Sequence, residues 1–67
     1  MKVQLINLGR NNINKIVFLK DNKALNREID RCVMVPGWTL VKDPRDDNSY
    51  HVLRGMDIIG KVKILER

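Results

Sequence analysis

The chain has 67 residues, of which 43% are hydrophobic, and carries a formal net charge of +5 at pH 7. This length allows one small domain, spanning residues 1–67, whose core confers only marginal stability. Because Cys32 is the only cysteine and His51 the only histidine, an intramolecular disulfide and an ordinary zinc site are excluded. The apolar runs are far shorter than the roughly 20 residues of a membrane span, and the first residues lack a secretory signal pattern. We therefore expect a soluble, cytoplasmic protein that does not interact with a membrane.

The positive charge is concentrated toward the two ends of the chain. Residues 1–20 hold basic residues and no acidic one, residues 21–47 have a net charge of −1, and residues 48–67 have a net charge of +2. Such an asymmetry favours an acidic partner, although net charge also serves solubility.

The first twenty residues predict two strands. Residues 2–8 end at Gly9-Arg10-Asn11-Asn12, a cluster of residue types that form turns. Residues 13–20 contain Ile16-Val17-Phe18-Leu19, which is apolar on both faces and favours a central strand or one buried in a barrel. Asp21-Asn22 then predicts either a tight hairpin turn or the N-cap of a helix.

Residues 23–35 carry two conflicting patterns. Leu25, Ile29 and Cys32 have the i, i+4, i+7 spacing of a helix. Residues 29–35 also alternate as a strand does and are rich in β-branched residues. We expect a strand over residues 29–35, while residues 23–28 fit a helix or a strand.

Pro36-Gly37 predicts a turn, and the clearest hairpin of the chain follows it. Residues 38–43 and 49–54 are its expected strands, joined by a polar loop over residues 44–48. A short bend at Gly55-Met56-Asp57 leads to a last strand near residues 60–65.

These elements predict an all-β, or mainly β, fold. Five to six short antiparallel strands in so small a chain form a strongly bent sheet or an SH3-like barrel, with the option of one short helix around residues 22–31. In such barrels the last strand pairs near the first, which places Lys2 and Gln4 on the same face as Lys61 and Lys63. The inward face then receives Val3, Leu5, Val62 and Ile64.

The sequence offers no constellation for catalysis. Ser49 lies two positions from His51, where a strand places both on one face without close contact, and nothing around Cys32 indicates an activated thiol. The scattered glycines match no nucleotide-binding spacing, and the Asp-rich residues 43–48 lack the order of a calcium loop. We expect a protein that is not an enzyme and has no cofactor, no metal and no small-molecule substrate.

The basic residues are the feature that favours a binding function. A cationic face on a small β domain suits the phosphate backbone of nucleic acid. The expected phosphate contacts are Lys2, Arg10, Lys15, Arg54, Lys61 and Lys63. Trp38 and Tyr50 are the expected aromatic contacts because they lie on the clear hairpin, although Trp38 fits the core equally well. The leading hypothesis is a module that binds nucleic acid or a nucleoprotein assembly.

The alternative hypothesis is a small regulatory or inhibitory protein. Several segments are apolar on both sides of a strand, and side chains left outside the core form an exposed apolar patch. Such a patch, together with a free sheet edge, binds another protein or a second copy of the chain in a homodimer.

Overall fold

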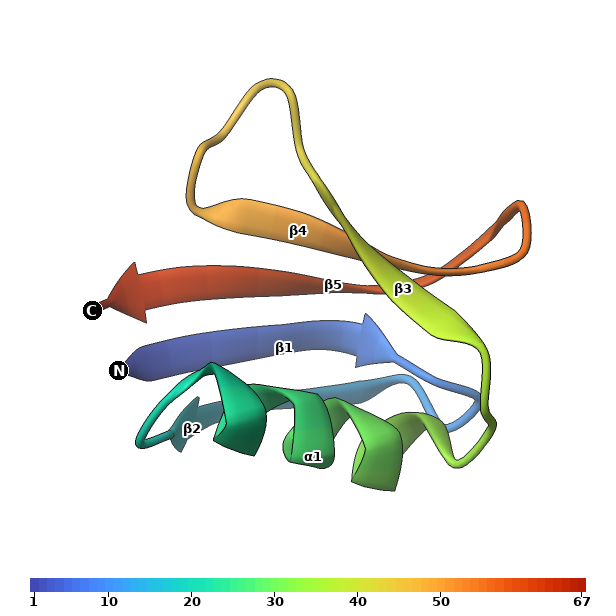
Figure 1. The fold of residues 1–67 in the computed structure, drawn as a ribbon, viewed down its shortest axis with the longest axis horizontal. Coiled ribbons are helices and arrows are strands. Elements are labelled where there is room, and N and C mark those ends of the chain that lie inside the picture. The colour runs from blue at the N-terminus through green and yellow to red at the C-terminus, as the bar shows by residue number, and fades with distance from the viewer.

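A computed structural model describes all residues of the chain, Met1–Arg67. The elements in chain order are β1 (Lys2–Leu8), β2 (Ile13–Phe18), α1 (Asn22–Val33), β3 (Trp38–Lys42), β4 (Ser49–Arg54) and β5 (Asp57–Glu66). The strands form one antiparallel sheet in the order β2-β1-β5-β4-β3 (Figure 1). The helix carries the chain from one edge strand, β2, to the other, β3.

The mainly β fold expected from the sequence is confirmed, with five antiparallel strands and one short helix. The last strand pairs with the first, so that Val3 lies opposite Ile64 and Leu5 opposite Val62. Of the two forms that the sequence left open, the structure has the open sheet, because β2 and β3 do not pair to close a barrel. Instead of a barrel wall, the helix α1 covers the apolar face of the open sheet.

The prediction of a strand over residues 29–35 is wrong, because α1 continues to Val33. The helical spacing prevails since it places Leu25, Ile29 and Cys32 on one face, where all three are buried against the sheet. A strand would have placed Cys32 on the face opposite to Leu25 and Ile29. The helix has neither the length nor the apolar character of a membrane span.

Both ends of α1 have a local cause in the sequence. Asp21 is the N-cap rather than part of a hairpin turn, and its Oδ1 accepts a hydrogen bond from the Ala24 N–H at 2.9 Å. At the other end Met34 adopts a φ of 64°, and its N–H donates to the Asp30 carbonyl.

One hydrophobic core lies between α1 and the sheet. Its members are Val3, Leu5, Leu8, Leu25, Ile29, Cys32, Val33, Val52, Val62 and Ile64. Because successive residues of a strand point to opposite faces, the residues between these positions lie on the other face of the sheet. No helix packs on that second face, which we call the uncovered face (Figure 1).

β2 is an edge strand, so the prediction of a central or barrel-buried strand for this segment is wrong. Val17 lies opposite Val3 and packs against the core. Ile16 and Phe18 point the other way and are 51% and 77% exposed. An apolar strand at the edge of an open sheet thus buries only one of its two sides.

The second half of the chain follows the expected hairpins. β3 and β4 pair antiparallel across the loop of residues 43–48, and Gly55-Met56 turns the chain directly into β5. β5 is longer than expected because it begins at Asp57, where it still pairs with Arg54.

Candidate nucleic-acid interface

Lysines from two neighbouring strands meet on the uncovered face. In the register between β1 and β5, Gln4 lies opposite Lys63 and Ile6 opposite Lys61. Lys2 stands two residues before Gln4 and therefore faces the same way. Lys2, Lys61 and Lys63 form a basic group that we call the lysine cluster.

The members of the lysine cluster differ in their ion pairing. The Nζ of Lys61 lies 3.9 Å from Oδ2 of Asp43, and the Nε2 of His51 lies 3.4 Å from the same oxygen. Asp43 thus offsets part of the positive charge at this end. None of the ion pairs of the structure involves Lys2 or Lys63, so their ammonium groups are free for an anionic partner.

The loop of residues 43–48 borders the lysine cluster and binds its own backbone. Oδ1 of Asp46 accepts a hydrogen bond from the Asn48 N–H, and Oδ2 accepts one from the Ser49 hydroxyl. These hydrogen bonds lower the pKa of Asp46, and Lys63 contributes a smaller Coulombic effect in the same direction. The Asp-rich loop therefore has the turn-forming structure that Asp and Asn favour.

An exposed aromatic ring lies beside the lysine cluster. Phe18 is opposite Lys2 in the pairing of β1 with β2, and the Lys2 Nζ lies 5.8 Å from the ring centroid. Phe18 is absent from the contacts expected from the sequence because it belongs to the most apolar run. Its alternation with the core-facing Val17 was the signal that could have found it.

The two expected aromatic contacts lie on the face of the sheet that α1 covers, which we call the helix side. The Trp38 Nε1 donates a hydrogen bond to Oδ1 of Asp30 on α1, and Tyr50 lies opposite the buried Val62. Both rings pack against the core and are only partly exposed. The aromatic ring beside the lysine cluster is therefore that of Phe18, while Trp38 and Tyr50 lie on the opposite face of the sheet.

Lys15 also lies on the helix side, away from the lysine cluster. It stands opposite Leu5, and its Nζ lies 2.7 Å from Oε1 of Glu28 on α1. This contact raises the pKa of Lys15 and lowers that of Glu28, against the burial of the carboxylate. The charge of Lys15 is thus compensated within the fold.

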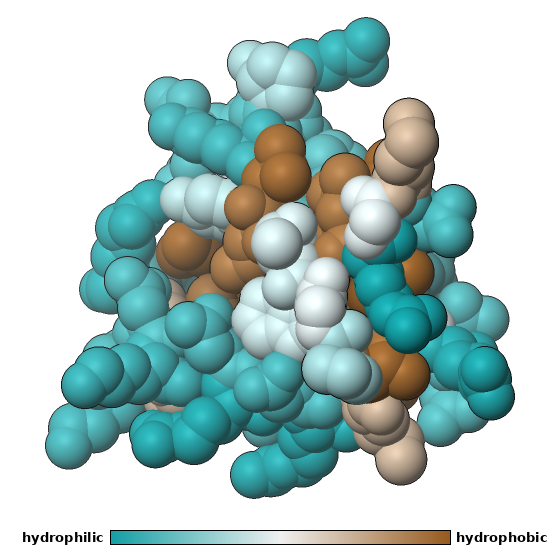
Figure 2. All heavy atoms as spheres, turned by 45° about the vertical axis from the view of Figure 1, so that its right-hand side comes forward, coloured by the Kyte–Doolittle hydropathy of each residue, from teal (hydrophilic) through white to brown (hydrophobic).

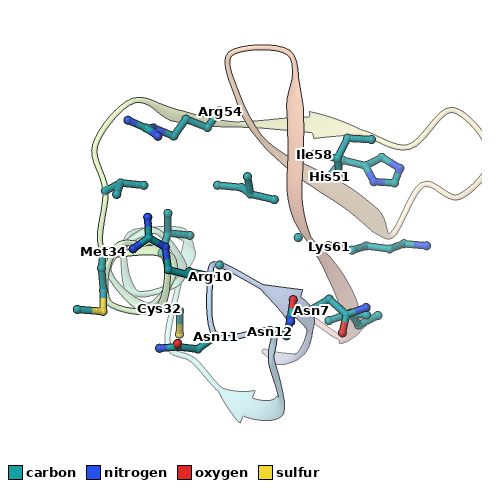
Figure 3. Close-up of a pocket in the computed structure, with 16 residues that line it drawn as sticks. Asn7, Arg10, Asn11, Asn12, Cys32, Met34, His51, Arg54, Ile58 and Lys61 are labelled. Carbon is teal, nitrogen blue, oxygen red and sulfur yellow. The ribbon is translucent and has the colours of Figure 1, made fainter.

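Arg10 lies in the β1–β2 turn and Arg54 ends β4, both at the end of the sheet on the right of Figure 1, where α1 also ends. In Figure 2, where this end is turned toward the viewer, apolar atoms are exposed in the middle and hydrophilic atoms surround them. Both arginines line a cavity of about 1040 Å³ (Figure 3). Lys61 and His51 also line it, so the cavity extends to the uncovered face.

The structure contains no group of three or more His, Cys, Asp or Glu residues placed to hold a metal ion. No protein-family model matches this chain, and no curated protein or solved structure matches it either. The geometry of the uncovered face is therefore the basis for a proposal about function.

Proposed function

We propose that this protein is a non-enzymatic module that binds single-stranded nucleic acid across the uncovered face of its sheet. The observation that carries the proposal is the lysine cluster beside the exposed ring of Phe18. Ammonium groups bind backbone phosphates, and an exposed aromatic ring stacks on an unpaired base. One extended strand of nucleic acid lying across β2, β1 and β5 would meet both.

A single strand fits this face better than a duplex. Stacking on Phe18 requires a base that is free of its Watson–Crick partner. Reading a DNA duplex usually requires a helix or a β-ribbon that enters the major groove. Here α1 packs against the opposite side of the sheet, and the lysine cluster lies on β1 and β5 in the middle of the sheet.

Contacts of the reactive side chains support binding without catalysis. Cys32 is buried in the core, and burial raises the pKa of its thiol, which disfavours the nucleophilic thiolate. The Ser49 hydroxyl is buried and donates to Asp46 rather than to His51. We place the module in the cytoplasm, where a lone thiol stays reduced.

The test is fluorescence anisotropy of a short labelled oligonucleotide, offered single-stranded and as a duplex, over a range of NaCl concentrations. We expect tighter binding of the single strand and a steep loss of affinity with salt. Lys2→Gln and Lys63→Gln should each reduce the salt slope by about 1, since each removes one phosphate contact. Phe18→Ala should weaken binding by roughly 5- to 100-fold, the usual effect of losing one stacked base.

The matched control is Lys23→Gln, which removes the same charge from an exposed position on α1. Its affinity should equal that of the wild type. No binding at low ionic strength would overturn the proposal. An equal loss from Lys23→Gln would also overturn it, because net charge and not the uncovered face would then explain the affinity.

The edge strand β2 favours a second candidate function, that of a regulatory or inhibitory protein with a protein partner. Ile16 and Phe18 expose apolar surface along a strand whose outer edge is unpaired. A partner strand, or β2 of a second copy, would extend the sheet there. Under this alternative, Phe18→Ala abolishes a complex that survives nuclease and moderate salt, while Lys63→Gln leaves that complex intact.

A further inference from the structure

The cavity at the C-terminal end of α1 combines basic and apolar walls and contains no acidic residue. Arg10, Arg54 and Lys61 are among its lining residues, and neither Asp nor Glu is. Its apolar wall includes Met34 and Ile58, which are 75% and 65% exposed. Exposed apolar side chains beside the two arginines, which form no ion pair, suit a ligand that is itself part apolar and part anionic.

The backbone fixes the positions of both arginines. Arg10 follows Gly9, whose N–H donates to the Ile59 carbonyl at 2.8 Å and whose φ of 74° makes the turn. Arg54 ends β4 opposite Trp38, on the helix side of the sheet. In Figure 3 the Arg10 side chain lies beside Met34 at the left of the cavity, and the Arg54 side chain lies above them.

The electrostatic balance of the cavity favours an anion. The C-terminal end of α1 contributes the equivalent of about half a negative charge. Arg10 and Arg54 each carry a full positive charge, and neither takes part in an ion pair of the structure. Two uncompensated guanidinium groups therefore outweigh the helix end.

We propose that this cavity binds a phosphate monoester carried on a nucleoside. The guanidinium forks of Arg10 and Arg54 would bind the phosphate oxygens in pairs. Met34 would contact the flat face of the base, since a methionine side chain adapts its shape to an aromatic ring. Such a group has two sources, a free nucleotide or the phosphorylated end of a strand bound on the uncovered face; only the second rests on the proposed function.

The first experiment is a titration of the ¹⁵N-labelled protein with AMP, adenosine and inorganic phosphate, followed by amide chemical shifts. AMP should shift the amides of residues 9–12 and 54–60 and bind at least about 10-fold more tightly than either fragment, because only AMP fills both parts of the cavity. Arg10→Gln and Arg54→Gln should each weaken AMP binding by about 10-fold. Lys23→Gln on α1 is the matched control and should bind AMP like the wild type.

The second experiment distinguishes the two sources. Anisotropy is measured with oligonucleotides that carry a 5′-phosphate, a 3′-phosphate or neither. If the strand end is the ligand, one terminal phosphate raises affinity by about 10-fold in the wild type and has no effect in Arg10→Gln. If a free nucleotide is the ligand, AMP binds and terminal phosphates make no difference.

Two outcomes overturn the inference while leaving the proposed function standing. The first is salt-sensitive, Lys63-dependent strand binding with neither AMP binding nor an effect of terminal phosphates. The second is AMP binding that Arg10→Gln and Arg54→Gln do not change. Conversely, AMP binding in the cavity of a protein that binds no oligonucleotide would refute the proposed function alone.

Discussion

The two faces of the sheet come from the same strands and differ in what covers them. On the helix side Val3 and Leu5 of β1 are fully buried, and even Lys15 has a counter-ion there. On the uncovered face the intervening Lys2 and Gln4 have no partner element, and Phe18 exposes most of its ring. The burial of the core therefore explains which residues lie on the helix side. The cations and apolar groups of the uncovered face have no such explanation, and the proposed binding of nucleic acid is the one that we put to the test.

The largest difference in stability between the two faces is expected from substitutions of two neighbouring residues of β1. Leu5→Ala should destabilise the fold by about 2–5 kcal/mol, because it leaves a cavity beneath α1. Gln4→Ala, one residue away on the uncovered face, should change the free energy of unfolding by less than about 0.5 kcal/mol. Urea denaturation followed by circular dichroism measures both. Similar losses from the two variants would mean that both faces are buried in solution.

A smaller loss of stability is expected from a substitution at Gly60, where the backbone of β5 approaches β1. A Cβ at Gly60 would lie 2.6 Å from Cδ1 and 2.8 Å from Cα of Leu8, so Gly60→Ala must move backbone atoms. We expect a loss of about 2–3 kcal/mol.

Gly37→Ala is the control for this comparison. Gly37 has a φ of 87° but open space around it, so the variant should lose only about 1 kcal/mol from backbone strain. Thermal melting shows which of the two variants is less stable. A larger loss of stability in Gly37→Ala than in Gly60→Ala would contradict the close approach of Gly60 to Leu8.

The ion pair on the helix side should contribute about 1 kcal/mol, because Lys15 is 42% exposed and water screens the pair. Glu28→Gln removes it, together with the contact at 3.6 Å to Arg31. The Lys15 contact holds the pKa of Glu28 below its ordinary value of 4.5. Because the folded pKa is the lower one, the stabilisation is complete above that value and is lost as the pH falls through the folded pKa.

The stability difference between the wild type and Glu28→Gln should therefore shrink when the pH is lowered from neutral to about 3. Urea denaturation at both pH values measures it, and the remaining carboxylates cancel because both proteins carry them. A difference that is the same at both pH values would show that Glu28 stabilises the fold through packing alone.

The smallest effect on stability is expected at the exposed edge. Phe18→Ser should change the free energy of unfolding by less than about 0.5 kcal/mol, because the ring is 77% exposed. The same variant should lose oligonucleotide affinity, and this separation of stability from binding is the signature of the uncovered face. A large loss of stability would instead show that Phe18 is buried, for example in a complex of two copies that analytical ultracentrifugation would detect.

The alternation of β1 and β5 was sufficient to predict several parts of the fold. Val3, Leu5 and Val62 face the core as expected, and the two lysines of β5 share the opposite face with Lys2. The hairpin of β3 with β4 follows from its turn residues. Local periodicity and turn chemistry are properties of short segments, so the sequence carries them without help from the rest of the chain.

The identity of the site residues required the tertiary structure. Lys15 resembles the other basic residues in the sequence, and only the packing of α1 brings Glu28 to its side. Phe18 resembles a core residue, and only the edge position of β2 exposes it. Arg10 and Arg54 are far apart in the chain, and only the fold places both along one cavity together with the end of α1.

By itself, then, the sequence determined the mainly β character, the pairing of the first strand with the last and the lysines on one face. The tertiary structure decided that the sheet stays open, that residues 29–33 are helical and that β2 lies at an edge. The physical reason is that burial is shared between distant segments. Whether Ile29 belongs to a helix, or Phe18 to a core, depends on which surface lies opposite it in the fold.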